Sequence, residues 1–137
     1  MDYGLISKVS GPLVVADGIP GAKLYDTVLV SDKKLLGEII EIRGEKASIQ
    51  VYEETSGISV GEKVVSNYRP LSVALGPGIL SRMLDGIGRN LENYALKTGY
   101  FLTRGEQVDT LDHTKQWSFI ALAKPGDQVS SGDKLGY

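Results

Sequence analysis

Residues Gly126 to Lys134 are the segment of this sequence that comes nearest to a phosphate-binding loop. Such a loop follows the pattern G-x-x-x-x-G-K-[ST], in which backbone amides surround the phosphates and the lysine reaches the terminal ones. Here five residues separate Gly126 from Gly132, and Asp133 puts a carboxylate where phosphate would lie. Gly76-Pro77-Gly78 lacks the third glycine of a dinucleotide motif, and its proline has no amide to offer an anion. We therefore predict turns in both segments and no nucleotide site.

Acidic residues and one histidine are the other candidates for chemistry. Glu53 and Glu54 are adjacent, and adjacent residues of a strand point to opposite faces, so we expect a solvated rim and no shared acid-base catalysis. The single histidine, His113, lies near Asp109 and Asp112, which are residue types that bind metals. Without a second histidine or a cysteine, a metal site there is not favoured. The sequence therefore predicts no catalytic, cofactor-binding or metal-binding residue in this chain.

The composition limits the classes of function. The 137 residues suffice for one ordinary domain or two small ones. Lys and Arg number 15 against 17 Asp and Glu, and a net charge of -2 does not favour a nucleic-acid partner. With no cysteine, disulfides and thiolate metal sites are excluded. Residues 1–4 do not resemble a secretory signal, and the longest apolar stretch, Pro12 to Ala16, is far shorter than the roughly 20 residues that span a bilayer. We expect a cytoplasmic chain.

The first half of the sequence predicts a small all-β barrel. Short runs rich in Val and Ile are separated by turn residues about every ten positions, which is typical of such barrels. Closing the strands into a barrel removes exposed edges. The predicted strands are Gly4 to Ser10, Leu13 to Asp17, Asp26 to Val30, Leu35 to Arg43, Lys46 to Glu53 and Lys63 to Ser66.

A hairpin is predicted around Gly44-Glu45. Ala47, Ile49 and Val51 alternate with polar residues after this turn, so one face of that strand is apolar and the other wet. Ile40 and Ile42 alternate with charged residues on the strand before it.

The second half of the sequence predicts less regular structure. Arg69-Pro70 marks a domain boundary, because proline removes a hydrogen-bond donor and biases the residue before it toward extended geometry. One helix of about two turns is expected between Asn90, which can cap its start, and Gly99, which can end it. Trp117 to Ala123 is predicted as a strand, with Trp117 and Phe119 pointing together into a core.

Three turns of similar sequence occur in the chain. They lie at Val60 to Val64, Pro125 to Val129 and Ser131 to Leu135, and each has Gly-Asp or Gly-Glu before an apolar residue. Turn chemistry is sufficient to explain the similarity. The last two are also similar to the turns of barrel-sandwich folds such as lipoyl and biotinyl carriers.

Two long runs carry a family resemblance. Residues 49–64 read I-Q-V-Y-E-E-T-S-G-I-S-V-G-E-K-V, and residues 69–89 read R-P-L-S-V-A-L-G-P-G-I-L-S-R-M-L-D-G-I-G-R. They resemble the amino-terminal part of the catalytic, A-type subunit of archaeal and vacuolar-type rotary ATPases. The resemblance implies a mainly β chain in three parts: a six-stranded barrel over 1–68, a connector with one short helix over 69–99, and over 100–137 the partial, barrel-sandwich-like start of the bulge insertion.

The same resemblance implies a function for the complete subunit. It would hydrolyse or make ATP with Mg²⁺, coupled to proton or sodium movement across a membrane, and its barrel would hold a hexamer together with alternating B-type subunits. The complex, not this chain, would attach to the membrane, at its periphery. The ATP site is expected beyond Tyr137, so no binding residue is carried over and the chain by itself is predicted inactive. Gly88 and Asn90 depart from the family, which usually has Gln and Pro there.

Two other functions remain open from the residues. Small barrels also occur as independent modules that bind single-stranded nucleic acid or protein. The Gly-Asp turns motivate a carrier-like β domain, which would need an exposed lysine at a hairpin tip with a strand on either side, whereas Lys124 and Lys134 are expected beside turns in an unfinished sheet.

Overall fold

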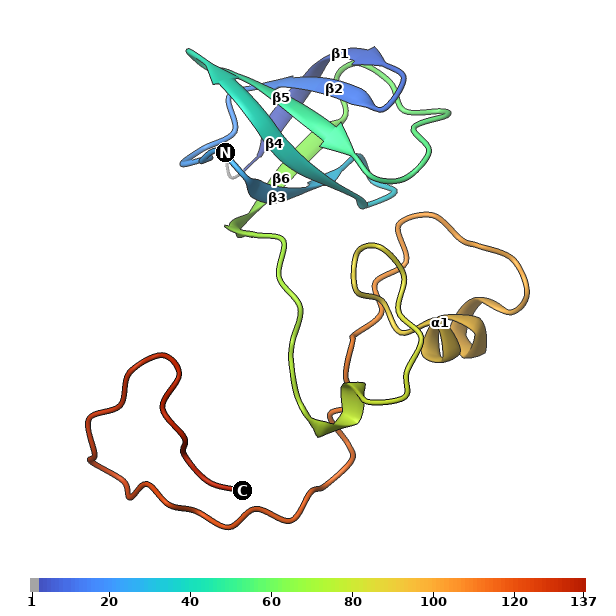
Figure 1. Cartoon of the computed structure of the whole chain (residues 1–137). Coiled ribbons are helices and arrows are strands. Elements are labelled where there is room, and N and C mark those ends of the chain that lie inside the picture. The colour runs from blue at the N-terminus through green and yellow to red at the C-terminus, as the bar shows by residue number, and fades with distance from the viewer. Residues whose placement is uncertain (1–2) are drawn as a thin grey trace.

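Six antiparallel strands form a closed barrel (Figure 1). The strands are β1 (Gly4–Ser10), β2 (Leu13–Asp17), β3 (Asp26–Val30), β4 (Leu35–Arg43), β5 (Lys46–Val51) and β6 (Lys63–Pro70). They follow the order β1-β2-β5-β4-β3-β6, and β6 closes the barrel against β1. This computed structural model describes residues 3–137. The first two residues of the predicted barrel domain, Met1 and Asp2, lie outside the described residues. The predicted six-stranded barrel is confirmed.

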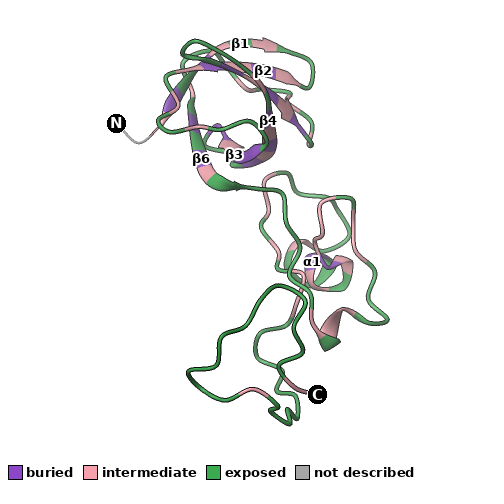
Figure 2. Ribbon diagram, turned by 60° about the vertical axis from the view of Figure 1, so that its left-hand side comes forward, coloured by how far each residue is buried: buried purple, intermediate pink, exposed green. Residues whose placement is uncertain are grey.

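Aliphatic side chains fill the interior of the barrel, where Figure 2 shows the buried residues. Burying one such side chain contributes about 1.5–3 kcal/mol. On β5 the predicted alternation is confirmed, because Ala47, Ile49 and Val51 face inward. The buried core consists of Ile6, Val14, Ala16, Val28, Val30, Leu35, Ile39, Ala47, Ile49, Val51 and Val64.

Strand β4 contains a bulge directly after Ile39, which is its last buried residue. Ile39 pairs with Ile49, but the next pair joins Glu41 to Ser48, so Ile40 is an extra residue on this strand. Ile39 is fully buried, whereas Ile40 is 43% exposed and Ile42 is also exposed. An extra residue of this kind interrupts the alternation of faces. The apolar alternation at Ile40 and Ile42 therefore does not mark the core, although the predicted hairpin of β4 and β5 is present.

Two predicted strand ends were wrong. The strand predicted to end at Glu53 ends at Val51, because the following residues turn away from the barrel into a loop. The strand predicted to end at Ser66 continues to Pro70, because it pairs with β3 as far as Asp26. Proline is tolerated there because the pairing of β3 with β6 is irregular between Asp26 and Val28, and prolines within sheets occur at such bulges.

The predicted short helix is confirmed as α1 (Leu91–Thr98). Asn90 Oδ1 accepts hydrogen bonds from the amides of Glu92 and Asn93, at 3.0 and 3.2 Å. Gly99, with φ of 76°, ends the helix and donates its amide to the carbonyl of Ala95. Upstream, the predicted turn at Gly76-Pro77-Gly78 forms the single 3-10 turn η1 (Pro77–Ile79).

The predicted strand from Trp117 to Ala123 was wrong. The segment pairs only with residues 135–137, through a bridge between Ala121 and Gly136 and hydrogen bonds that Ile120, Leu122, Ala123 and Tyr137 donate. Phe119 is 65% exposed and Trp117 is also exposed, so neither belongs to a core. A two-stranded pairing with no further strand or helix to pack on is at best marginally stable. Figure 1 shows this segment at the far end of the molecule from the barrel.

Helices within residues 3–137 are all too short or too polar to cross a membrane.

Candidate functional site

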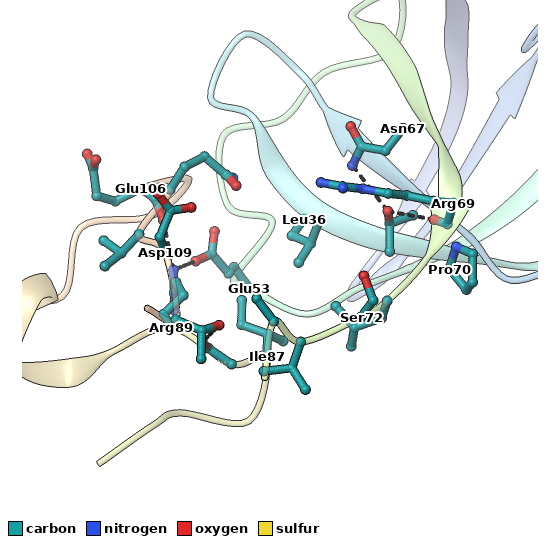
Figure 3. Close-up of a pocket in the computed structure, with 18 of the residues that line it drawn as sticks. Leu36, Glu53, Asn67, Arg69, Pro70, Ser72, Ile87, Arg89, Glu106 and Asp109 are labelled. Carbon is teal, nitrogen blue, oxygen red and sulfur yellow. Dashed lines mark hydrogen bonds and ion pairs between the residues drawn. The ribbon is translucent and has the colours of Figure 1, made fainter. Parts of the chain in front are cut away.

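A polar cleft of about 380 Å³ lies between one end of the barrel and the chain that follows it (Figure 3). Three parts of the sequence meet there. The barrel and its loops contribute Thr27, Leu36, Glu53, Asn67 and Arg69; the connector contributes residues 70–74 and 87–89; the returning chain contributes residues 106–110 and His113. The cleft is therefore made by the way the chain folds back onto the barrel.

Arg89 lies at the centre of the ionic contacts in this cleft. Its Nη1 is 2.6 Å from Glu53 Oε1, and its Nε is 2.7 Å from Asp85 Oδ2. Nη1 also donates to the carbonyl of Glu106 at 3.3 Å, and the guanidinium lies 4.8 Å from the centre of the Tyr94 ring. The side chain of Arg89 is 17% exposed. Arg89 thus joins the barrel, the connector and the helix.

The turn before Arg89 places this side chain. Asp85 Oδ1 accepts hydrogen bonds from the amides of Ile87 and Arg89, at 3.1 and 2.9 Å. Aspartate commonly stabilises a turn through such bonds to its own backbone. Gly88 has φ of 86°, which a side chain disfavours. The sequence Asp85-Gly86-Ile87-Gly88-Arg89 therefore forms a tight turn that brings Arg89 back beside Asp85.

The two carboxylate oxygens of Glu53 contact different segments of the chain. Oε1 meets Arg89, and Oε2 accepts a hydrogen bond from the amide of Gly105 at 2.7 Å. Its side chain is only 10% exposed. Because these partners lie 36 and 52 residues away in the sequence, one carboxylate connects the barrel to two distant parts of the chain.

These contacts shift the pKa values of two groups. Burial by itself would raise the pKa of the Asp85 carboxyl, but the hydrogen bonds from Arg89 and Ile87 lower it below its usual value. Burial by itself would lower the pKa of the Arg89 guanidinium, but the hydrogen bonds and charges of Asp85 and Glu53 outweigh burial and raise this pKa above its usual value. Both groups therefore stay charged at neutral pH. A fixed ion pair of this kind positions chain segments and does not exchange protons near pH 7.

The structure separates the two adjacent glutamates, as predicted, but the expected solvated rim was wrong for Glu53. Glu53 points into the cleft and is paired, as Figure 3 shows, whereas Glu54 is exposed and accepts a hydrogen bond from Ser56 Oγ. The difference arises because the chain after β5 is a loop that turns Glu53 toward Arg89.

The three similar turns have the same hydrogen bonds. The carboxylates of Glu62, Asp127 and Asp133 accept from the amides of Ser59, Lys124 and Ser130, at 2.8, 2.8 and 2.7 Å. In each case the acidic side chain closes its own turn. Turn chemistry therefore accounts for the similarity, and for the resemblance of residues 126–134 to a phosphate-binding loop.

His113 and Asp109 both line the cleft, whereas Asp112 is bonded within its own turn. Asp112 Oδ1 accepts from the amide and hydroxyl of Thr114, at 2.9 and 2.6 Å, and these bonds lower the pKa of the exposed Asp112 carboxyl. Across residues 3–137, His, Cys, Asp and Glu form no group of three or more that could hold a metal ion.

Arg89 is the site residue that sequence reasoning missed. The spacing of Asp85 and Arg89 was visible in the sequence, but the pairing with Glu53 was not, because it depends on the fold. No short sequence motif can contain both Glu53 and Arg89, which lie 36 residues apart.

The fold and comparisons with known proteins identify the class of this chain. Residues 6–66 match the family described as ATP synthase alpha/beta family, beta-barrel domain. The barrel is thus a member of that domain family.

The chain as a whole is homologous to the N-terminal region of the V-type ATP synthase alpha chain. It is 56% identical over 136 residues to that protein from Thermoanaerobacter sp. (strain X514). It is 53% identical over 137 residues to that of Clostridium perfringens (strain SM101 / Type A), and 50% identical over 136 residues to that of Clostridium botulinum (strain Hall / ATCC 3502 / NCTC 13319 / Type A). Each match covers 99% of this chain but only 23% of the curated relative.

Proposed function

We propose that this chain supplies the assembly barrel of the catalytic, A-type subunit of a rotary ATPase, whose ATP site lies in other parts of the complete polypeptide. The homology to V-type ATP synthase alpha chains over 99% of the chain carries this proposal. The closed barrel supports it, because a barrel without free strand edges is a rigid unit that can be placed beside similar units without open-ended aggregation.

The three-part organisation belongs to the same proposal. Residues 1–68 form the barrel, residues 69–99 lead toward a nucleotide-binding domain, and residues 100–137 begin the bulge insertion. ATP and Mg²⁺ bind to the complete polypeptide, and its partners are the B-type subunits and the other components of the complex. The complex works in the cytoplasm at the periphery of a membrane, coupling ATP to proton or sodium movement.

A chimera tests the proposed function. Residues 1–137 replace the corresponding region of the Thermoanaerobacter V-type ATP synthase alpha chain, which is then produced with the beta chain of the same complex. We expect assembly with the beta chain, measured by native mass spectrometry, and ATP hydrolysis. As a control, Val64→Asp places a charge in the barrel core, where Val64 is fully buried, and abolishes assembly. Failure of the chimera to assemble while its barrel amides stay protected from exchange would overturn the proposal.

The location of the ATP site is tested on the chain by itself. A fluorescent ATP analogue is titrated into the chain and into Lys134→Ala, and we expect no saturable binding to either. Tight binding that Lys134→Ala abolishes would show that the chain holds its own nucleotide site.

A further inference from the structure

The chain that leaves the barrel is held to it at two separate points. Arg89, in the connector, forms an ion pair with Glu53. Gly105, in the returning chain, donates its amide to the same carboxylate. Asp85 completes the set by orienting Arg89 from within the connector. We call these four residues, Glu53, Asp85, Arg89 and Gly105, the latch.

Neighbouring contacts support the second attachment point. Arg104 Nη1 donates to the carbonyls of Glu54 and Ser56, both at 2.9 Å. Gly105 has φ of 74°, and a side chain at this position would collide with the backbone carbonyl of Lys33 in the turn between β3 and β4. The returning chain therefore lies directly against two barrel loops, and only a glycine fits at the point of contact.

The latch is the main connection between the barrel and residues 85–106. The hydrophobic core is confined to the barrel, and Tyr94 is the buried residue of α1. With little apolar surface shared across the cleft, hydrogen bonds and ion pairs must hold the two parts together. Because the side chains of Glu53 and Arg89 are mostly buried, removal of either would leave its partner's charge unpaired, which is costly.

We propose that Glu53 is the central residue of a conformational latch, which fixes residues 85–106 against the barrel and so sets the direction in which the chain leaves it. Without the Glu53 carboxylate, the ion pair with Arg89 and the bond from the Gly105 amide are lost together, and the bonds of Arg104 to the loop carbonyls by themselves do not keep this segment fixed relative to the barrel. The inference concerns the conformation of this chain and does not depend on whether the chain assembles with a beta chain.

Hydrogen exchange of the full 137-residue chain tests the latch. In Glu53→Gln we expect the amide of Gly105, which donates to the Glu53 carboxylate, to exchange about tenfold faster or more, because its charged acceptor has been lost. Glu54→Gln is the matched control, since Glu54 is exposed and contacts only Ser56 by its side chain. Gly105→Ala, which alters no charge, should accelerate exchange at the same amide. Exchange in the barrel strands should stay unchanged in all three variants.

A distance measurement tests the direction of the chain. The sequence has no cysteine, so Lys8→Cys on β1 and Leu96→Cys on α1, both at exposed positions, take spin labels at unique sites. We expect one narrow distance distribution in the parent chain and in Glu54→Gln, and a broad one in Glu53→Gln. An unchanged distribution in Glu53→Gln, unchanged exchange at the amide of Gly105, or equal acceleration in the barrel strands would each overturn the latch.

Discussion

At the scale of the residue, the electrostatics of the cleft rest on one arginine shared by two carboxylates. Arg89 can meet both because its guanidinium presents several donors in a fixed plane. Asp85 reaches Nε, and Glu53 reaches Nη1. A lysine, with a single ammonium, could not reproduce this geometry. The position therefore depends on the shape of the side chain as well as on its charge.

We expect the ionic attachment of residues 85–89 to the barrel to weaken at acidic pH. The pKa of Asp85 is lowered in the folded chain. Its contribution to stability is therefore fully present above the ordinary aspartate pKa of about 3.9, and is lost as pH falls through the lower folded value. An NMR titration of the Asp85 carboxyl should give a midpoint below about 3.9.

Asp85→Asn is the control for this titration. It should remove the corresponding part of the pH dependence of hydrogen exchange at Arg89. A midpoint for Asp85 at or above the ordinary value would show that Arg89 does not stabilise the carboxylate.

At the scale of the element, β4 shows how one extra residue redirects a strand. A strand of strict alternation would put Ile40 and Ile42 on the face opposite Ile39. The bulge between Ile39 and Glu41 lets this strand fill the core with Leu35 and Ile39 near its start and still pair with β5 to its end at Arg43. Bulges of this kind also bend a strand, which helps a barrel to close.

A pair of neighbouring substitutions tests the register of β4. Ile39→Ala removes a fully buried side chain and should lower the free energy of unfolding by about 2–5 kcal/mol. Ile40→Ala, at an exposed position, should cost less than about 1 kcal/mol. Urea unfolding followed by far-ultraviolet circular dichroism measures both. Equal losses in the two variants would mean that Ile40 faces the core as Ile39 does.

At the scale of the whole molecule, regular structure and burial are concentrated in the barrel. Figure 2 shows buried residues in the barrel and predominantly exposed ones in the chain that ends at Tyr137. The barrel is tied together by pairing around its full circumference. Residues 111–137 have one bridge and no buried residue.

This contrast predicts a gradient of local stability. Amides in β4 and β5 should exchange only when the whole barrel unfolds, because each of these strands is paired on both sides. Amides of residues 117–123 should exchange within about tenfold of the rate of an unfolded chain, because the bonds of Ile120, Leu122 and Ala123 to residues 135–137 form a pairing without a buried residue or a further strand beside it. Hydrogen exchange with mass spectrometry resolves the two groups. Equal protection of both would mean that residues 117–123 are packed as firmly as the barrel.

The sequence by itself determined the local elements of this protein. The six strands, the cap at Asn90 and the three acidic turns could be predicted because each depends on neighbouring residues, through alternation or a side-chain bond to nearby backbone. The sequence also carried the family resemblance, which lies in two continuous runs.

Tertiary structure decided what depends on residues that are distant in the chain. The bulge after Ile39 follows from pairing with β5, and the exposure of Trp117 and Phe119 follows from the lack of a sheet to support them among residues 3–137. The role of Glu53 depends on Arg89 and Gly105, which only the return of the chain brings to it. Spacing along the sequence does not indicate these contacts, because they form only when the chain that follows β6 folds back against the barrel.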